Sequence, residues 1–158
     1  MVWMSNSKDR TANGLKNQPS KDALSVALDA VNDRWSLHIV RALAFGATRY
    51  TEILRAVGAP RDVLAARLRK LTESGIVRPR PSDNGRGGYE LTQKGRDLGQ
   101  LILVLKRWGD TYREEGVPTV DFVHDSCGEV FVAELHCQAC GRLLGPGELS
   151  VATSEPTC

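Results

Sequence analysis

The chain has 158 residues, of which 41% are apolar and 25% are charged, enough for one compact domain and a small appendage. No apolar run approaches the ~20 residues that cross a bilayer, and the polar beginning lacks the apolar stretch of a secretory signal. Three of the four cysteines lie between residues 127 and 140, too local for a disulfide framework and more typical of a metal site in a reducing compartment. Composition therefore argues against a membrane protein, a disulfide-rich secreted domain and a fully disordered chain.

The net charge of +2 is distributed unevenly. Residues 49–96 carry 11 basic and 5 acidic side chains, whereas residues 118–158 carry 1 basic and 6 acidic ones. A basic middle segment favours a polyanionic partner, although charge alone is equally compatible with a solvated surface.

Residues 1–19 are polar and aperiodic, and we expect a flexible arm there. Helical periodicity predicts one helix after Ser20, a candidate N-cap, and a second that Asp33 caps and Gly46 ends. Two more helices are expected, one over residues 50–57 and one starting at Pro60. Their predicted inward positions are Leu24, Ala27, Leu28 and Val31, then Trp35, Ile39, Val40 and Leu43, then Tyr50, Ile53, Leu54 and Val57, and last Leu64, Leu68 and Leu71.

Residues 76–80 and 88–91 are predicted to form a β-hairpin, because turn-forming residues separate them. Thr92 is expected to cap a long helix that runs to about Glu115. Its apolar positions cover nearly all sides and include Leu98, Leu101, Ile102, Leu103, Val104, Leu105, Trp108 and Tyr112. A helix of this kind is buried on two fronts, so we expect one side to face its own domain and the other a second copy of the chain.

Two short helices joined by a glycine-containing turn and followed by a hairpin with a basic tip make a winged helix-turn-helix. Its fourth helix fits the major groove of DNA, where arginines reach guanine edges or phosphates, Asp62 accepts from a cytosine amino group, and small Ala65 and Ala66 can touch thymine methyls. In the hairpin, Arg86 is expected in the minor groove, and Arg78 and Arg80 at phosphates. The predicted DNA-binding set is Arg49, Arg61, Asp62, Ala65, Arg69, Arg78, Arg80, Asn84 and Arg86.

Two alternatives remain open at this point. Winged helices also serve as protein-interaction modules, and Arg61 and Asp62 can be solvated residues of a first helical turn, where the helix dipole favours Asp62.

Six segments, in order and correctly spaced over about residues 22–112, resemble the HxlR-type transcriptional regulators. They are LDAVNDRWSLHIVRAL at 28–43, TRYTEI at 48–53, VLAARLRKL at 63–71, GIV at 75–77, YELT at 89–92 and WG at 108–109. The resemblance implies a homodimer built on the first and last helices, a bacterial or archaeal cytoplasm, and a near-palindromic operator. Many members carry a sensing cysteine near the start of the first helix, but this chain has SKDA at residues 20–23, so thiol sensing at that position is absent.

The cysteine-rich tail contains HDSCG at 124–128 and CQACG at 137–141, and each motif is the pattern of a turn that points two ligands at one point. His124, Cys127, Cys137 and Cys140 together make a tetrahedral set that suits a structural Zn²⁺ ion, and residues 129–135 alternate as a short hairpin does. His136 is an alternative to His124. A reversible disulfide between Cys137 and Cys140, or unpaired thiols, are the other interpretations.

The predicted fold is mainly α with a small β-hairpin, divided into a flexible arm (1–19), a winged helix-turn-helix DNA-binding and dimerisation domain (20–116) and a zinc-ribbon-like β extension (117–158). No catalytic motif is present, so we expect a regulator and not an enzyme. Its expected partners are double-stranded DNA and a second copy of the chain. The expected place for any small-molecule effector is between the long helix and the winged domain. The rival hypotheses are an adaptor that recruits proteins through its acidic ribbon, and a regulator that responds to redox state or metal through the cysteines.

Overall fold

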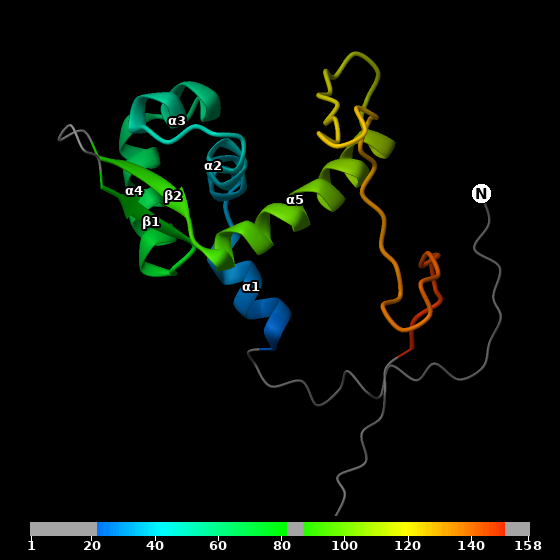
Figure 1. Cartoon of the computed structure of the whole chain (residues 1–158). Coiled ribbons are helices and arrows are strands. Elements are labelled where there is room, and N and C mark those ends of the chain that lie inside the picture. Colours follow the sequence, from blue (N-terminus) through cyan, green and yellow to red (C-terminus); the bar gives the residue numbers. More distant parts are fainter. Residues whose placement is uncertain (1–21, 82–86, 151–158) are drawn as a thin grey trace, which may run out of the picture. The chain divides into compact units, whose positions relative to one another are not determined.

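The computed structural model describes residues 22–81 and 87–150. The elements in chain order are α1 (Ala23–Val31), α2 (Arg34–Ala44), α3 (Tyr50–Val57), α4 (Arg61–Glu73), β1 (Val77–Arg80), β2 (Gly88–Leu91) and α5 (Gln93–Tyr112) (Figure 1). The chain divides into a main unit, Val26–Ala133, and a second unit made of Met1–Ser25 and Glu134–Cys158. None of the described helices is both long enough and apolar enough to span a membrane.

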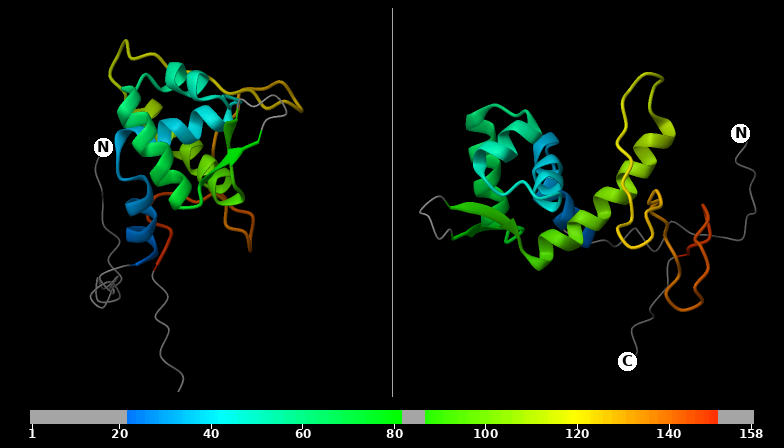
Figure 2. Two further views of the ribbon diagram at one scale, coloured as in Figure 1. Left: turned by 90° about the vertical axis from the view of Figure 1, so that its left-hand side faces the viewer. Right: turned by 45° about the horizontal axis from the view of Figure 1, so that its top comes forward.

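The hydrophobic core of the main unit lies among α2, α3, α4 and the hairpin. Its buried members are Ile39, Val40, Leu43, Ile53, Ala59, Leu64, Leu68, Leu71, Ile76, Val77 and Leu91. The predicted inward stripes of α2, α3 and α4 are confirmed, because the buried residues recur at helical spacing. Two further views show α2, α3 and α4 grouped together with the hairpin beside α4, while α5 leads away from them (Figure 2).

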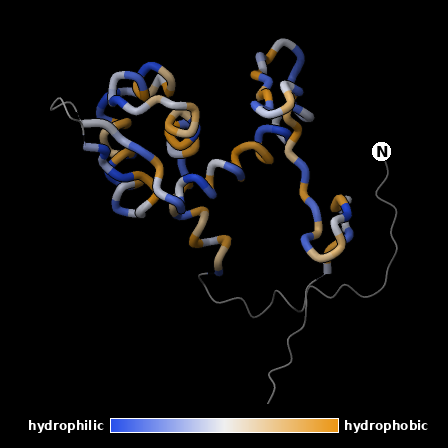
Figure 3. Tube along the Cα trace, in the orientation of Figure 1, coloured by the Kyte–Doolittle hydropathy of each residue, from blue (hydrophilic) through white to orange (hydrophobic). Residues whose placement is uncertain are grey.

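The first helix departs from the sequence prediction, because none of its residues is buried. Leu24 and Leu28, predicted to point inward, are 65% and 54% exposed. The hydrophobic residues along α1 are visible in Figure 3. Within one copy of the chain, only Ala30 of this helix packs against the core. The apolar side of α1 is therefore available to pack against another surface.

The helix ends follow the predicted caps with two adjustments. Thr92 caps α5 by accepting the N–H of Gly95 at 3.2 Å, as expected. Pro60 is the N-cap of α4 and not its first residue. Ser20 lies outside the described residues, and the N–H of Ser25 donates to the Asp22 carboxylate at 2.7 Å, so Asp22 serves the start of α1.

Asp33 caps α2 and ties it to α4. Its carboxylate accepts the N–H groups of Trp35 and Ser36 at 2.9 and 3.0 Å and the hydroxyl of Ser36 at 2.5 Å, and Arg67 of α4 lies 3.4 Å away. Burial raises the pKa of Asp33, but the hydrogen bonds from Ser36 and Trp35 and the charge of Arg67 outweigh it, so the pKa is lowered.

We therefore expect Asp33→Ala to lower the free energy of unfolding by about 1–2 kcal/mol at pH 7. Because the pKa of Asp33 is lowered in the folded state, its carboxylate contributes its full stabilisation of the fold above the unfolded-state pKa of about 3.9. This contribution disappears as the pH falls through the folded-state pKa of Asp33. Urea denaturation at pH 7 and pH 3 should show that the difference in the free energy of unfolding between wild type and variant is smaller at pH 3. A gap of unchanged size at pH 3 would contradict the role of the ionised carboxylate.

The hairpin forms the wing and is joined to the helices at both ends. Val77 pairs with Leu91, and Arg80 pairs with Gly88. The N–H of Tyr89 donates to the carbonyl of Thr48 at 2.8 Å, which holds β2 against the loop before α3. The predicted hairpin is confirmed, with β1 beginning one residue later than expected.

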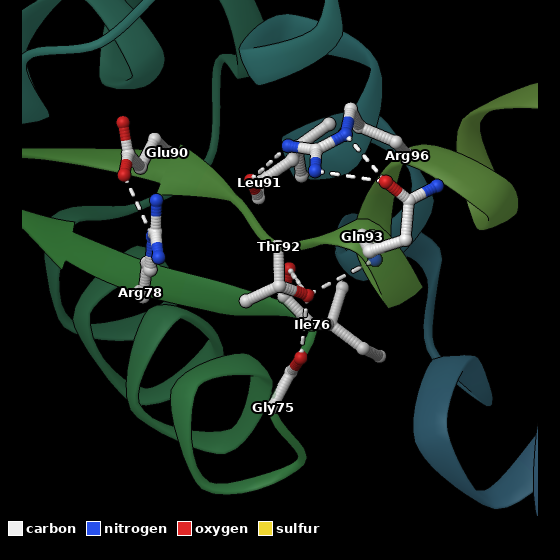
Figure 4. Close-up of polar contacts among 9 residues, drawn as sticks. Gly75, Ile76, Arg78, Glu90, Leu91, Thr92, Gln93 and Arg96 are labelled. Carbon is white, nitrogen blue, oxygen red and sulfur yellow. Dashed lines mark hydrogen bonds and ion pairs between the residues drawn. The ribbon is translucent and has the colours of Figure 1, made fainter.

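At the base of the wing, Thr92 joins α4, β1 and α5. Its hydroxyl lies 2.7 Å from the carbonyl oxygen of Gly75 and 3.2 Å from that of Ile76, and Figure 4 shows it between these two groups. The Arg96 guanidinium donates to the carbonyl of Leu91 at 3.0 Å. The first turn of α5 is thereby fixed to the end of the hairpin.

After α5, residues 117–133 contact its C-terminal half. Arg107 donates to the carbonyl of Ala133, and Thr119 donates to Asp110 at 2.6 Å. The Phe122 ring stacks on Phe45, at the end of α2, with ring centroids 4.5 Å apart. The main unit therefore continues past the domain end predicted at residue 116.

The hairpin predicted within residues 129–135 does not form. The described tail contains two isolated bridges, Val123 with Val130 and His136 with Leu143, and residues 131–135 are not in a strand. Alternation of apolar residues is insufficient for a strand where no apolar surface covers one face, and Ala133 is the only buried residue among 117–150.

Candidate nucleic-acid interface

The exposed side of α4 presents the residues that were predicted to face DNA. Leu64, Leu68 and Leu71 are buried on the inner side. The opposite side exposes Arg61, Asp62, Ala65, Ala66 and Arg69. The exposure of this set confirms the predicted orientation of the helix, whereas the individual DNA contacts remain predictions.

The angle between α3 and α4 is held by a specific hydrogen bond. The hydroxyl of Tyr50, the first residue of α3, donates to the carbonyl of Arg61 at 2.8 Å. The Glu52 carboxylate accepts the N–H groups of Thr48 and Arg49 at 2.9 Å each. These backbone hydrogen bonds lower the pKa of Glu52, and its negative charge suits the first turn of α3. The segment that carries the exposed Arg49 is therefore fixed next to the start of α4.

The wing arginines differ from one another. Arg80 is exposed at the end of β1. Arg78 is 64% exposed, but its Nε lies 2.6 Å from the carboxylate of Glu90 on the neighbouring strand (Figure 4), so a phosphate must compete with this ion pair. This ion pair was not predicted from the sequence; it follows from the strand register, because Arg78 lies opposite Glu90. Asn84 and Arg86 lie outside the described residues.

One described cavity occupies the place expected for an effector. It measures about 220 Å³ and lies between α2, β2 and α5, where Phe45, Leu91, Ile102 and Leu103 line it. The location was predicted from the sequence but its lining residues were not, because they come from three elements that are distant in the chain.

The predicted metal ligands occur in two separate turns. His124 and Cys127 belong to the main unit, and Cys137 and Cys140 belong to the second unit. Within the described ranges no three His, Cys, Asp or Glu side chains are gathered as a metal-binding group; each turn supplies two. Hydrogen bonds to the Cys137 sulfur from the backbone N–H groups of Cys140 and Ala139 and from the Cys140 thiol lower the pKa of Cys137.

Over most of its length the chain is similar to proteins that are named as HTH-type transcriptional regulators. Residues 30–117 match the HxlR-like helix-turn-helix family. The HTH-type transcriptional regulator Rv3095 of Mycobacterium tuberculosis is 42% identical over 125 residues, covering 77% of this chain and 78% of that protein.

Solved structures show the same fold. PA1607, named as a candidate transcription factor, is 30% identical with a TM-score of 0.77, covering 85% of this chain and 96% of that one. The reduced form of the redox regulator HypR is 26% identical with a TM-score of 0.54, covering 59% and 95%.

The helices, the wing and the outward face of α4 define a winged helix-turn-helix protein of the DNA-binding class. The matching residues include all of α2 to α5. The chain belongs to the HxlR-like helix-turn-helix family and is a DNA-binding transcriptional regulator.

Proposed function

We propose that the protein binds a near-palindromic operator as a homodimer, with α4 of each copy in the major groove and the wing at the adjacent minor groove. The observation that carries this proposal is the two-sided character of α4, whose leucines are buried and whose arginines are exposed. A helix fits the major groove and reads base edges with its exposed side. Charge supports the same reading, since residues 49–96 carry a net +6.

The dimeric state is supported by apolar side chains that are exposed to solvent in a single copy of the chain. On α5, Leu101, Leu105, Trp108 and Tyr112 are 48–71% exposed, and Trp108 and Tyr112 contact each other with ring centroids 5.5 Å apart. They recur at helical spacing on one side of the helix, while Leu98 and Ile102 pack against the core. The exposed side of α5, together with the equally unburied α1, is the surface for a second copy.

The protein acts by binding and not by catalysis, and it does so in the cytoplasm, where a bacterial operator is accessible. This part of the proposal rests on the relatives, because Rv3095 is named as a transcriptional regulator.

The α4 surface is tested by Arg69→Ala. Each arginine–guanine pair contributes about 1–3 kcal/mol, and a dimer loses two of them, so we expect operator affinity to fall at least about tenfold. Fluorescence anisotropy with DNA from upstream of the gene, measured over a range of salt concentrations, checks both affinity and its salt dependence.

The matched control is Arg113→Ala, which removes the same charge at the C-terminal end of α5, where Arg113 donates to the carbonyl of Val117. We expect its affinity to stay close to wild type. Equal losses of operator affinity in both variants would refute the assignment of α4 as the recognition helix. Wild-type binding that is weak and insensitive to salt would refute it as well.

A further inference from the structure

The cavity of about 220 Å³ between α2, β2 and α5 has an apolar interior, because Phe45, Leu91, Ile102 and Leu103 line it. We call it the α2–α5 pocket. Leu91 belongs to the buried core and Ile102 packs against that core, so this part of the lining is fixed. An apolar cavity of about 150 Å³ takes up benzene, whereas drug-sized ligands need about 300–1,000 Å³. The pocket therefore fits one ring with one small substituent.

The lining includes an aromatic ring that a ligand can contact. Phe45 is the C-cap residue of α2 and is 58% exposed. The stack between its ring and that of Phe122 fixes its orientation. Aromatic pairs gain stability beyond the burial of their surface when they meet in an offset or edge-to-face arrangement. An aromatic ligand is therefore favoured over an aliphatic one of the same size.

The charged side chains that line the α2–α5 pocket are positive. They are Arg41 and Arg96, and no carboxylate is among the described lining residues. The Arg96 guanidinium already donates to the carbonyl of Leu91 at 3.0 Å and to the side chain of Gln93 at 2.9 Å (Figure 4). Arg41 is exposed, and within the described ranges its guanidinium has no hydrogen bond or ion pair. Arg41 is therefore the cation that can pair with an anionic ligand.

The same side of α2 carries further positive charge. Arg34, His38 and Arg41 are spaced by four and three residues, which places them on one side of the helix. Burial, followed by the charges of Arg41 and Arg34, lowers the pKa of His38. The two arginines thus create a positive potential that disfavours a further cation at this surface. A positive potential of this kind attracts anions.

The pocket faces away from the apolar side of α5 that is assigned to the second copy. At 3.6 residues per turn, Gly99 and Leu103 of the pocket lie on the opposite side of the helix from Leu105 and Trp108. All of the lining residues belong to the main unit, Val26–Ala133. The site is therefore complete within one copy, and a ligand can enter it without separating a dimer.

We propose that the α2–α5 pocket binds a small aromatic carboxylate, with its ring against Phe45 and Ile102 and its carboxylate group at Arg41. A guanidinium donates two parallel N–H groups to a carboxylate, and the apolar lining gains from burying the ring. A neutral ring lacks the first contribution, and a carboxylate without a ring lacks the second. The lining thus selects for both parts of the ligand.

The pocket is connected to the parts of the molecule that position the wing. Leu91 is the last residue of β2. Phe45 directly precedes the loop in which the carbonyl of Thr48 accepts the N–H of Tyr89 at 2.8 Å. A ligand that contacts both segments therefore biases the position of the wing. This regulatory step rests on the proposed operator binding, and we expect the bound ligand to change operator affinity by about fivefold or more.

The test is a titration of the full-length protein with benzoate, followed by the methyl NMR signals of Leu91, Ile102 and Leu103. We expect saturable shifts with a Kd of about 1 mM or tighter, an affinity per atom that small ligands reach. Benzamide has the same ring without the charge and should bind about fivefold more weakly, because it lacks the ion pair with the exposed Arg41. Acetate should give no saturable shift of these methyl signals.

Two variants separate the contributions of charge and ring. Arg41→Gln should weaken benzoate binding about fivefold and leave benzamide binding unchanged. Gly99→Leu should abolish the binding of both, because a Cβ atom at Gly99 meets nothing within 4 Å and the leucine side chain extends into the pocket. The matched control is Arg34→Gln, which removes the same charge from α2 about 10 Å away along the helix axis. We expect this control to bind benzoate as tightly as wild type.

Three results would overturn the assignment of the pocket. They are benzoate shifts that do not saturate, equal affinities of the wild type for benzoate and benzamide, and equal benzoate affinities of Arg41→Gln and Arg34→Gln. The NMR titration needs no DNA, so it decides the site even if operator binding fails. Saturating benzoate that leaves the operator affinity of the wild type unchanged would overturn the regulatory step alone.

Discussion

Gly95→Ala is expected to lower the free energy of unfolding by about 3 kcal/mol, the upper end of what overpacking a core position costs. Gly95 is the third residue of α5 and is buried. A Cβ atom there would collide with the carbonyl oxygen of Ile76 and lie 3.0 Å from the Leu91 side chain. The carbonyl belongs to backbone that Thr92 holds in place, so the clash cannot be relieved by rotating a side chain.

Helix propensity acts in the opposite direction, since alanine is favoured over glycine by about 1 kcal/mol in a helix interior. Gly99→Ala, four residues further along the same helix, isolates that contribution, because a Cβ atom there meets nothing within 4 Å. We expect this control to be neutral or more stable than wild type. Chemical denaturation of the two variants measures the difference, and equal stability would show that α5 does not approach Ile76 closely.

Leu105→Glu is expected to separate the dimer and to lower operator affinity by about 100-fold or more. Two linked recognition helices bind DNA more tightly than one by that factor or more, because the second binding event becomes intramolecular. Leu105 is 48% exposed on α5, so the substitution leaves the core of each copy unchanged. A glutamate buried without a partner in an apolar interface carries a large desolvation cost.

The control for this variant is Gln100→Glu, which adds the same charge at an exposed position of α5 outside the apolar side. Light scattering during size-exclusion chromatography gives the mass in solution, and a thermal melt followed by circular dichroism shows that the monomer is folded. A wild-type protein that is monomeric at micromolar concentration, or a Leu105→Glu variant that remains dimeric, would refute the proposed interface.

Most of the helix-turn-helix and its wing could be predicted from the sequence because the relevant signals are local. The spacing of Leu64, Leu68 and Leu71 fixes which side of α4 is buried, and therefore which side carries Arg61 and Arg69. Asp33 and Thr92 cap their helices through hydrogen bonds to residues two or three positions away, so a few residues suffice to predict them.

The tail shows where local signals are insufficient. The two five-residue motifs were found in the sequence, yet the hairpin predicted after the first one does not form. The hydrogen bond between Phe122 and Phe131 joins two residues that the first motif does not include. Backbone pairing of this kind depends on the turn conformation, which the composition of the intervening residues does not specify.

The sequence by itself determined the helices and the wing of the main unit, the caps of α2 and α5, the side of α4 that is exposed, and the family. Periodicity, capping and motif order act over short stretches of chain. The tertiary structure decided which apolar faces stay open on α1 and α5, that Arg78 is engaged by Glu90, and that Phe122 stacks on Phe45. Periodicity shows that a face is apolar, but the surface that covers it comes from parts of the chain far away or from another copy. Burial and pairing are therefore settled only when the elements pack.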